Sequence, residues 1–108
     1  MGGLDARVVA ALRELDRWPW ETAFRERELA ARVGLSAGHL DRLFVQGCGV
    51  TPRMYLQKRR LESARAALTD EAVTVKQVAY ALGFGSAAHF CRWFKQVTGE
   101  TPGQARAG

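Results

Sequence analysis

The sequence predicts an all-α fold of about seven helices, and three observations support this. First, apolar residues recur at the spacing of one helix face, as at Val8, Leu12 and Leu15. Second, serine and threonine stand before several of these stretches and glycine after them, as expected at helix starts and stops. Third, no segment shows the alternating pattern of a strand.

One stretch of the sequence occurs twice in nearly the same form. SAGHLDRLF begins at Ser36 and SAAHFCRWF begins at Ser86, and over the seventeen residues from each serine nine positions are identical. Upstream, Ala30 and Gly34 have counterparts 49 residues later, so one copy has a single extra residue in its turn. Two copies are too few for a solenoid, which generally needs about three repeats. The repeat therefore indicates a duplicated functional unit.

The positive charge of the chain is concentrated in the repeated part. The net charge is +5, made of −1 over residues 1–30 and +6 over residues 31–108. Five positive side chains and no negative one lie between Arg42 and Arg60. This bias favours a polyanionic partner, with a merely solvated cationic surface as the alternative.

Composition also excludes several classes of protein. No apolar run approaches the ~18 residues of a membrane helix, and the N-terminus lacks the apolar core of a signal peptide. A cytoplasmic protein without membrane association is implied. Cys48 and Cys91 are too few for a disulfide framework, so we expect both to be reduced and buried.

The first helix is predicted from 5 to 18, with Asp5 as its N-cap. Pro19 ends it, because proline lacks the N–H and clashes with the preceding turn. Thr22 is the expected cap of a second helix, and Gly34 then makes a tight turn in the left-handed conformation that glycine tolerates. Aromatic residues near the first turn are expected in the core: Trp18, Trp20 and Phe24.

Ser36 is predicted to cap a helix that Gly49 closes, and a long helix with Thr51 as its cap then runs from Pro52 to about Leu68. The second copy repeats this order. Its predicted elements are a helix with a capping box from Thr74 to Gln77, a turn at Gly83-Phe84, a helix capped by Ser86 that ends near Gly99, and a last short helix or turn from Thr101-Pro102.

Each copy thus contains a helix, a glycine turn and a second helix, which is the helix-turn-helix arrangement. Two short helices cannot bury their apolar faces alone, so each pair must pack on a third helix. The first helix serves the N-terminal pair, and the 52–68 helix can lie between both pairs. We expect one domain, 1–108, with a first subdomain at 5–50, a linker helix at 51–69 and a second subdomain at 70–106.

The second helix of each pair carries polar residues on its outer side, namely His39, Asp41 and Arg42 in one copy and His89 and Arg92 in the other. A helix fits the major groove of DNA, where arginine can bond guanine O6 and N7 together. A solvated face is the alternative reading. The repetition with arginine retained in both copies favours base recognition.

These residues resemble the DNA-binding domain of AraC/XylS-type bacterial transcription regulators over roughly residues 5–106. The resemblance rests on many positions at fixed spacing. In the first half these are Leu29-Ala30, Gly34, Ser36, Leu40, Arg42-Leu43-Phe44, Gly49, Thr51-Pro52, Tyr55-Leu56, Arg60-Leu61, Ala64 and Leu68; in the second half they are Val78-Ala79, Gly83-Phe84, Phe90, Arg92, Phe94-Lys95, Gly99 and Thr101-Pro102.

The resemblance implies two helix-turn-helix subdomains joined by one long helix, with both recognition helices on one side. A single chain would then read double-stranded DNA in two adjacent major-groove segments, about one helical turn or ~34 Å apart, and regulate bacterial transcription. The base-reading positions carried over from the family are Gly38, His39, Asp41, Arg42, Ala87, Ala88, His89 and Arg92. Arg42 and Arg92 are expected to be the main readers, and the two histidines to add base or phosphate contacts.

Several positions depart from the family pattern. Ala87 and Ala88 stand where polar side chains are common, although alanine can still contact a thymine methyl group. Gly38 is likewise a blank, and Asp41 could either accept from a cytosine amine or oppose phosphate. Ala105 replaces the usual aromatic residue, so we expect the final helix to fray.

Phosphate contacts are expected from eight further residues: Ser36, Arg53, Lys58, Arg59, Arg60, Lys76, Ser86 and Lys95. No cofactor or metal is expected, because the histidines and cysteines lack any paired zinc spacing and no phosphate-binding loop or carboxylate pair suggests an enzyme. The main alternative is a helical protein-interaction module. RNA polymerase is an expected second partner, with the acidic first helix as its surface: Asp5, Glu14, Asp16 and Glu21.

The family often carries an effector-binding or dimerisation domain ahead of the DNA-binding part, and 108 residues leave no room for one. The chain is therefore expected to act as a monomer, or to be the C-terminal part of a longer regulator that can form a dimer. The inducer, the operator and the choice between activation and repression stay open at this point.

Overall fold

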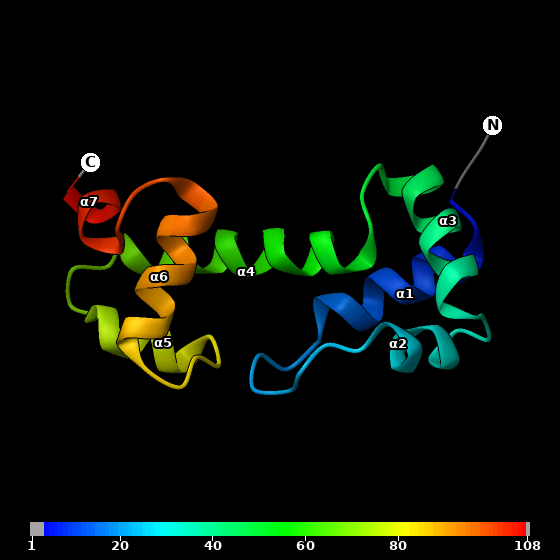
Figure 1. Cartoon of the computed structure of the whole chain (residues 1–108), viewed down its shortest axis with the longest axis horizontal. Helices are drawn as coiled ribbons and strands as arrows, with labels where there is room; N and C mark the ends of the chain where they lie inside the picture. Colours follow the sequence, from blue (N-terminus) through cyan, green and yellow to red (C-terminus); the bar gives the residue numbers. More distant parts are fainter. Residues whose placement is uncertain (1–3, 108) are drawn as a thin grey trace. The chain divides into compact units, whose positions relative to one another are not determined.

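The computed structural model describes residues 4–107, and over that range the chain forms seven α-helices and no strand (Figure 1). The all-α prediction is confirmed. In chain order the helices are α1 (Ala6–Asp16), α2 (Glu26–Arg32), α3 (Ala37–Cys48), α4 (Pro52–Leu68), α5 (Val75–Ala81), α6 (Ala87–Thr98) and α7 (Pro102–Ala107).

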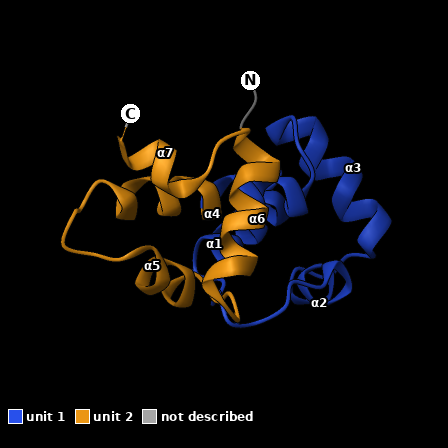
Figure 2. Cartoon of the chain, turned by 60° about the vertical axis from the view of Figure 1, so that its left-hand side comes forward, with its two compact units in different colours: residues 1–59 blue, residues 60–108 orange. Residues whose placement is uncertain are grey.

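The helices gather into two compact units, residues 1–59 and residues 60–108 (Figure 2). Unit 1 holds α1, α2, α3 and the first half of α4, and unit 2 holds the second half of α4 with α5, α6 and α7. The division falls inside α4, between Arg59 and Arg60. The long helix therefore supplies side chains to both units, whereas the sequence assigned 51–69 to a separate linker.

Unit 1 is a bundle in which α1 packs on both helices of the first helix-turn-helix. Its apolar core lies between these three helices, with Val8, Ala11, Leu15, Trp18, Leu29, Ala30, Leu40 and Phe44 buried. Asp5 caps α1 by accepting a hydrogen bond from the Arg7 N–H at 2.8 Å, as predicted. Pro19 follows one turn after the last residue of α1.

The turn between α1 and α2 corrects one prediction. Thr22 is not the cap of α2, because α2 begins at Glu26 with Arg25 at the N-cap, and no side chain caps it. Thr22 instead lies in the turn, where its carbonyl accepts from the Trp18 indole N–H at 3.1 Å. The Trp18 ring meets Phe24 edge to face at 5.2 Å. Ala23, Phe24 and Arg25 therefore separate the threonine from the helix that it was expected to cap.

Unit 2 has a core rich in aromatic rings. Phe84, Phe90 and Phe94 are buried, together with Val78, Ala79, Leu82, Ala64 and Leu68. Phe84 lies 5.3 Å from Phe90 and 5.2 Å from Trp93, measured between ring centroids. The rings occupy the space between α5, α6 and the second half of α4.

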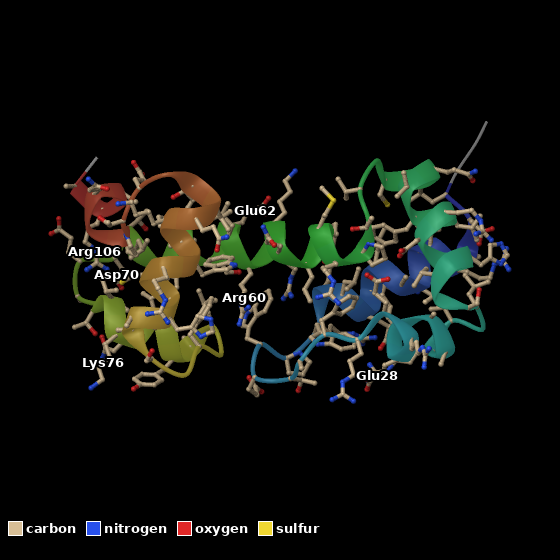
Figure 3. All side chains as sticks on the ribbon, viewed as in Figure 1. Glu28, Arg60, Glu62, Asp70, Lys76 and Arg106 are labelled. Carbon is tan, nitrogen blue, oxygen red and sulfur yellow. The ribbon has the colours of Figure 1, made fainter. Side chains whose placement is uncertain are left out.

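The last helix is formed rather than frayed through the described residues. Thr101 accepts from the Gln104 N–H at 3.1 Å, and the Gln104 side chain accepts from the Thr101 N–H at 2.7 Å. The Arg106 guanidinium, labelled in Figure 3, donates to two backbone carbonyls that the figure does not draw, that of Leu68 at 3.0 Å and that of Val73 at 2.6 Å. Arg106 thus ties α7 to the end of α4 without the aromatic residue that position 105 lacks.

Cys48 and Cys91 are free thiols, and both are half-buried rather than fully buried as predicted. Cys91 follows the buried Phe90 by one residue, about 100° round the helix, whereas Cys48 stands one turn after the buried Phe44 and packs against the edge of the unit 1 core. Burial raises the pKa of the Cys48 thiol. Among residues 4–107, no helix is long and apolar enough to cross a membrane.

Candidate nucleic-acid interface

The turn of the first helix-turn-helix is set by glycine and serine. Gly34 has a φ of 76°, in the left-handed region, and the next N–H, from Leu35, returns to the Ala30 carbonyl at 2.9 Å. Ser36 then caps α3 by accepting from the His39 N–H at 3.2 Å. These local bonds stop α2 and start α3 in a new direction, with Leu40 buried against the core.

The second helix-turn-helix has the same local geometry. Gly83 has a φ of 82°, and the Phe84 N–H returns to the Ala79 carbonyl at 3.0 Å. Ser86 caps α6 by accepting from the His89 N–H at 3.1 Å. The additional residue Gly85 lies between this turn and the cap, which explains the shift from a spacing of 49 to 50 along the repeat.

Arg42 on α3 and Arg92 on α6 are exposed, on the side away from the buried stripe of each helix. Gly38, one turn before Arg42, is exposed as well, and so is Ala88, one turn before Arg92. In unit 1 the arginine extends along its helix toward the N-terminus. An Nη1 atom of Arg42 lies 3.7 Å from the point that a Cβ of residue 38 would occupy.

The remaining predicted base-reading residues differ between the units. His89 is exposed and meets the Phe84 ring edge to face at 5.2 Å, whereas His39 is half-buried. Ala87 is half-buried at the start of α6. Asp41 is also half-buried, and its Oδ1 is buried without a hydrogen bond from any residue of the range 4–107. The predicted outer position of Asp41 is therefore wrong for one of its two carboxylate oxygens.

The eight predicted phosphate contacts separate by exposure. Lys58 on α4, Lys76 on α5 and Lys95 on α6 are exposed (Figure 3 labels Lys76). Arg53 is exposed too, but its guanidinium lies 3.6 Å from the Glu26 carboxylate and over the Phe24 ring. Two further candidates, Ser36 and Ser86, already use their hydroxyl oxygens as helix caps. A hydroxyl acting as a cap acceptor can still donate to a phosphate oxygen.

Arg59 and Arg60 are half-buried and hold backbone carbonyls inside their own units. Arg59 donates to the Leu15 carbonyl at 2.9 Å and lies over the Trp20 ring at 4.4 Å. Arg60 donates twice to the Leu82 carbonyl, at 2.7 and 3.2 Å, and lies over the Phe84 ring at 4.1 Å (Figure 3 labels Arg60). Burial lowers the pKa of Arg60. The phosphate role predicted for these two residues does not fit their placement, since both guanidinium groups are engaged with backbone carbonyls and aromatic rings of their own units.

Three exposed residues were missed by sequence reasoning: Arg27, Gln46 and Gln96. Arg27 on α2 is the counterpart of Lys76 on α5 at the 49-residue spacing, and both are exposed. Gln46 and Gln96 are identical in the two copies and exposed, one turn after Arg42 and Arg92 on the same helix face. Comparing every exposed polar position of the two copies, rather than the residues from Ser36 and Ser86 onward alone, would have found all three.

The acidic side chains of α1 are engaged within unit 1. Asp5 lies 3.1 Å from the Arg7 guanidinium, which lowers the pKa of its carboxyl, and Glu14 lies 2.8 Å from that of Arg32. Asp16 accepts from the Tyr55 hydroxyl at 2.6 Å. These residues therefore help to hold α1 in place. Within residues 4–107, no cluster of three or more histidine, cysteine, aspartate or glutamate residues could hold a metal ion.

Two units with one turn geometry, each with an exposed arginine on a serine-capped second helix, define a protein of the helix-turn-helix class. The helix-turn-helix domain family matches residues 29–108, and the chain belongs to this family, in its AraC type.

Relatives of known sequence and structure are similar to most of this chain. The HTH-type transcriptional regulator GlxA of Rhizobium meliloti is 38% identical over 78 residues, which are 72% of this chain and 24% of GlxA. An AraC-type transcriptional regulator from Chromobacterium violaceum is 30% identical, with a TM-score of 0.70 over 95% of both chains. The DNA-binding domain of AdpA, solved in complex with a target DNA, is 31% identical, with a TM-score of 0.73 over 94% of this chain and 88% of that one. The chain spans only 11% to 24% of the length of the curated relatives it matches.

Proposed function

We propose that this chain binds double-stranded DNA in a sequence-specific manner and regulates bacterial transcription. The observation that carries the proposal is the repeated outer face: an exposed arginine stands at the same place on the second helix of both helix-turn-helix units. Arginine there can bond guanine O6 and N7 together. The DNA complex of the similar AdpA domain supports the same assignment.

In this proposal α3 and α6 are the recognition helices, and they enter adjacent major-groove segments about one helical turn apart. Arg42 and Arg92 read bases, and the neighbouring residues His39, Asp41, Ala87, Ala88 and His89 complete the base-facing surface. The exposed cations bind phosphates: Arg27, Arg53, Lys58, Lys76 and Lys95. Arg59 and Arg60 are left out of this set because they bond to carbonyls within their units.

The proposal extends to the setting of the chain. We place it in the cytoplasm, where bacterial DNA is found, and we assign it no catalytic reaction. RNA polymerase is a second proposed partner, on the ground that the relatives are named as transcriptional regulators. The carboxylates of Asp5, Glu14 and Asp16 are engaged within unit 1, so α1 offers little free negative charge for that contact.

The test is selection from a randomised duplex pool at two salt concentrations. We expect enrichment of two short sequence blocks about one helical turn apart, with affinity falling steeply as salt rises. Enrichment of one block would mean that only one unit reads bases. Salt-sensitive binding without enrichment would contradict sequence recognition by this chain, and absence of binding at low salt would favour the protein-interaction alternative.

Single substitutions then separate the two kinds of contact. Arg42→Ala or Arg92→Ala should weaken binding to the selected site by about 1–3 kcal/mol and relax the preference at one base pair. Lys58→Ala should weaken all sequences alike and lower the salt slope by about one. The matched control is Arg13→Ala, which removes an exposed arginine of α1 outside the helix-turn-helix and should change neither quantity.

A further inference from the structure

Each of the two recognition helices has an exposed stripe of residues that begins with a very small residue. Residues four apart lie on the same helix face, so Gly38 stands one turn before Arg42 and Ala88 one turn before Arg92 on that face. All four residues are exposed. Neither residue 38 nor residue 88 has a side chain that can donate or accept a hydrogen bond. The same combination, a minimal residue one turn before an arginine, therefore occurs in both units.

Glycine at position 38 is not demanded by the fold. Gly38 lies in the ordinary helical conformation of α3, unlike Gly34 and Gly49, which have positive φ. Its surroundings do not exclude a Cβ either, unlike those of Gly47, where a Cβ would lie 2.7 Å from the Leu4 side chain. A glycine inside a helix is less favourable than alanine. Its presence here therefore calls for a reason outside the packing of unit 1.

The neighbour of the missing side chain at 38 is the arginine itself. The Arg42 Nη1 atom lies 3.7 Å from the point where a Cβ would be, which is ordinary van der Waals contact. A single methyl group would fit, whereas a longer side chain would need the volume that the guanidinium fills. Helical side chains point toward the N-terminus of their helix, and the N-terminal residues of a recognition helix are those that contact base edges.

We propose that Gly38 and Ala88 are specificity-determining residues that act by leaving this volume open. Each arginine extends over the small residue into the base-contacting end of its helix, where it replaces the side chain that the first turn lacks. Each unit then reads mainly one guanine, and the adjacent base pair is discriminated weakly. This inference rests on the proposed DNA binding and names the sequence feature that each unit recognises.

The test compares Gly38→Ala, Gly38→Gln and Ala88→Gln in the same pool selection. Gly38→Ala should keep the wild-type preference, because a Cβ fits beside Arg42. The glutamine variants should lose about 5- to 150-fold in affinity for the wild-type site, the equivalent of one bidentate base contact. They should also gain a preference for adenine, the base that glutamine bonds in bidentate fashion, in the block of the altered unit only. Gly103→Gln, at an exposed helical glycine of α7, is the matched control and should change neither.

Two outcomes overturn the inference. One is a Gly38→Gln variant that selects the wild-type sequence with wild-type affinity. The other is a wild-type block in which several base pairs of one unit are strongly specified and stay so in Arg42→Ala. Either would leave the proposed function standing, because the wild-type chain would still bind DNA. If the wild-type chain binds no duplex at low salt, the proposed function fails and this inference fails with it.

Discussion

Unit 1 and unit 2 contain the same helix-turn-helix motif but pack it with different core side chains. In unit 1 the second helix packs against α1, and leucines stand at positions 35, 40 and 43. In unit 2 the equivalent residues are Phe84, Phe90 and Trp93. The second half of α4 supplies the buried Ala64 and Leu68 to unit 2, as α1 supplies the buried Ala11 and Leu15 to unit 1, so the two interiors differ in the size of the side chains on the second helix. The two motifs share their exposed residues and their turn. Their buried residues differ, because each motif packs against different helices.

The long helix α4 contributes to both units. The adjacent residues Arg59 and Arg60 each donate to a carbonyl at a helix end, Leu15 for unit 1 and Leu82 for unit 2. The Leu15 carbonyl also accepts from the Trp18 N–H at 3.2 Å, and each guanidinium lies over an aromatic ring, Trp20 for Arg59 and Phe84 for Arg60. Two consecutive residues of one helix therefore hold elements of both units, Arg59 in unit 1 and Arg60 in unit 2.

Substitution in the aromatic core has the largest expected effect. Phe90→Ala should lower the free energy of unfolding by about 3–5 kcal/mol, because the buried ring is replaced by a cavity. Phe90→Leu, which installs the residue found in unit 1, should recover only part of this loss. Urea denaturation followed by tryptophan fluorescence measures both. Wild-type stability for Phe90→Leu would show that unit 2 does not need the larger aromatic side chain, and would contradict the proposed difference between the two cores.

Removal of the Arg60 side chain should have the next largest effect. Arg60→Ala leaves the Leu82 carbonyl without its charged donor and uncovers the Phe84 ring, at a cost of about 1.5–3 kcal/mol. Thermal melting with circular dichroism would report the loss. Lys58→Ala, two residues earlier on the same helix and exposed, is the control and should leave the melting temperature unchanged. Equal melting temperatures for the two variants would contradict the structural role of Arg60.

The first helices of the two motifs differ in their caps, and this difference can be tested in both directions. α5 has a capping box between Thr74 and Gln77, while Arg25 at the N-cap of α2 makes no side-chain cap. Thr74→Ala should cost about 1 kcal/mol of stability. Arg25→Ser should gain a smaller amount, since the backbone of residue 25 is already extended as a cap requires. A destabilising Arg25→Ser would show that the side chain of Arg25 has a role which its missing cap bond does not reveal.

The smallest effect concerns pH and is confined to unit 1. The hydrogen bond to Asp16 is the main reason why the pKa of Tyr55 is raised to about 12. Because the pKa is higher in the folded than in the unfolded chain, its contribution is complete below pH ~10 and is lost as the pH rises toward ~12. Tyr55→Phe should remove this dependence and cost about 1 kcal/mol or less at neutral pH. Stability curves of the two proteins that stay parallel from pH 9 to 12 would exclude the linkage.

Much of the fold was predictable because its determinants are local. The turn at Gly34, the serine caps and the capping box at Thr74 each depend on residues within a few positions of one another. Thr22 is the instructive failure. It has the chemistry of a cap, but Trp18 and Phe24 pack together around it, and that tertiary contact delays the start of α2 to Glu26. The exposure of Arg42 on α3 and of Arg92 on α6 was predictable in the same way, whereas the buried Oδ1 of Asp41 was not.

The sequence by itself determined the order of the helices, the turns and caps that delimit them, and the repeat of an arginine on each outer face. Only the tertiary structure decided what Lys58, Arg59 and Arg60 do. Consecutive helical residues point about 100° apart, so three neighbouring cations face three directions. Which of them meets a helix-end carbonyl and which meets water depends on the elements packed around α4. For the same reason Asp41 has one buried oxygen beside the exposed Arg42.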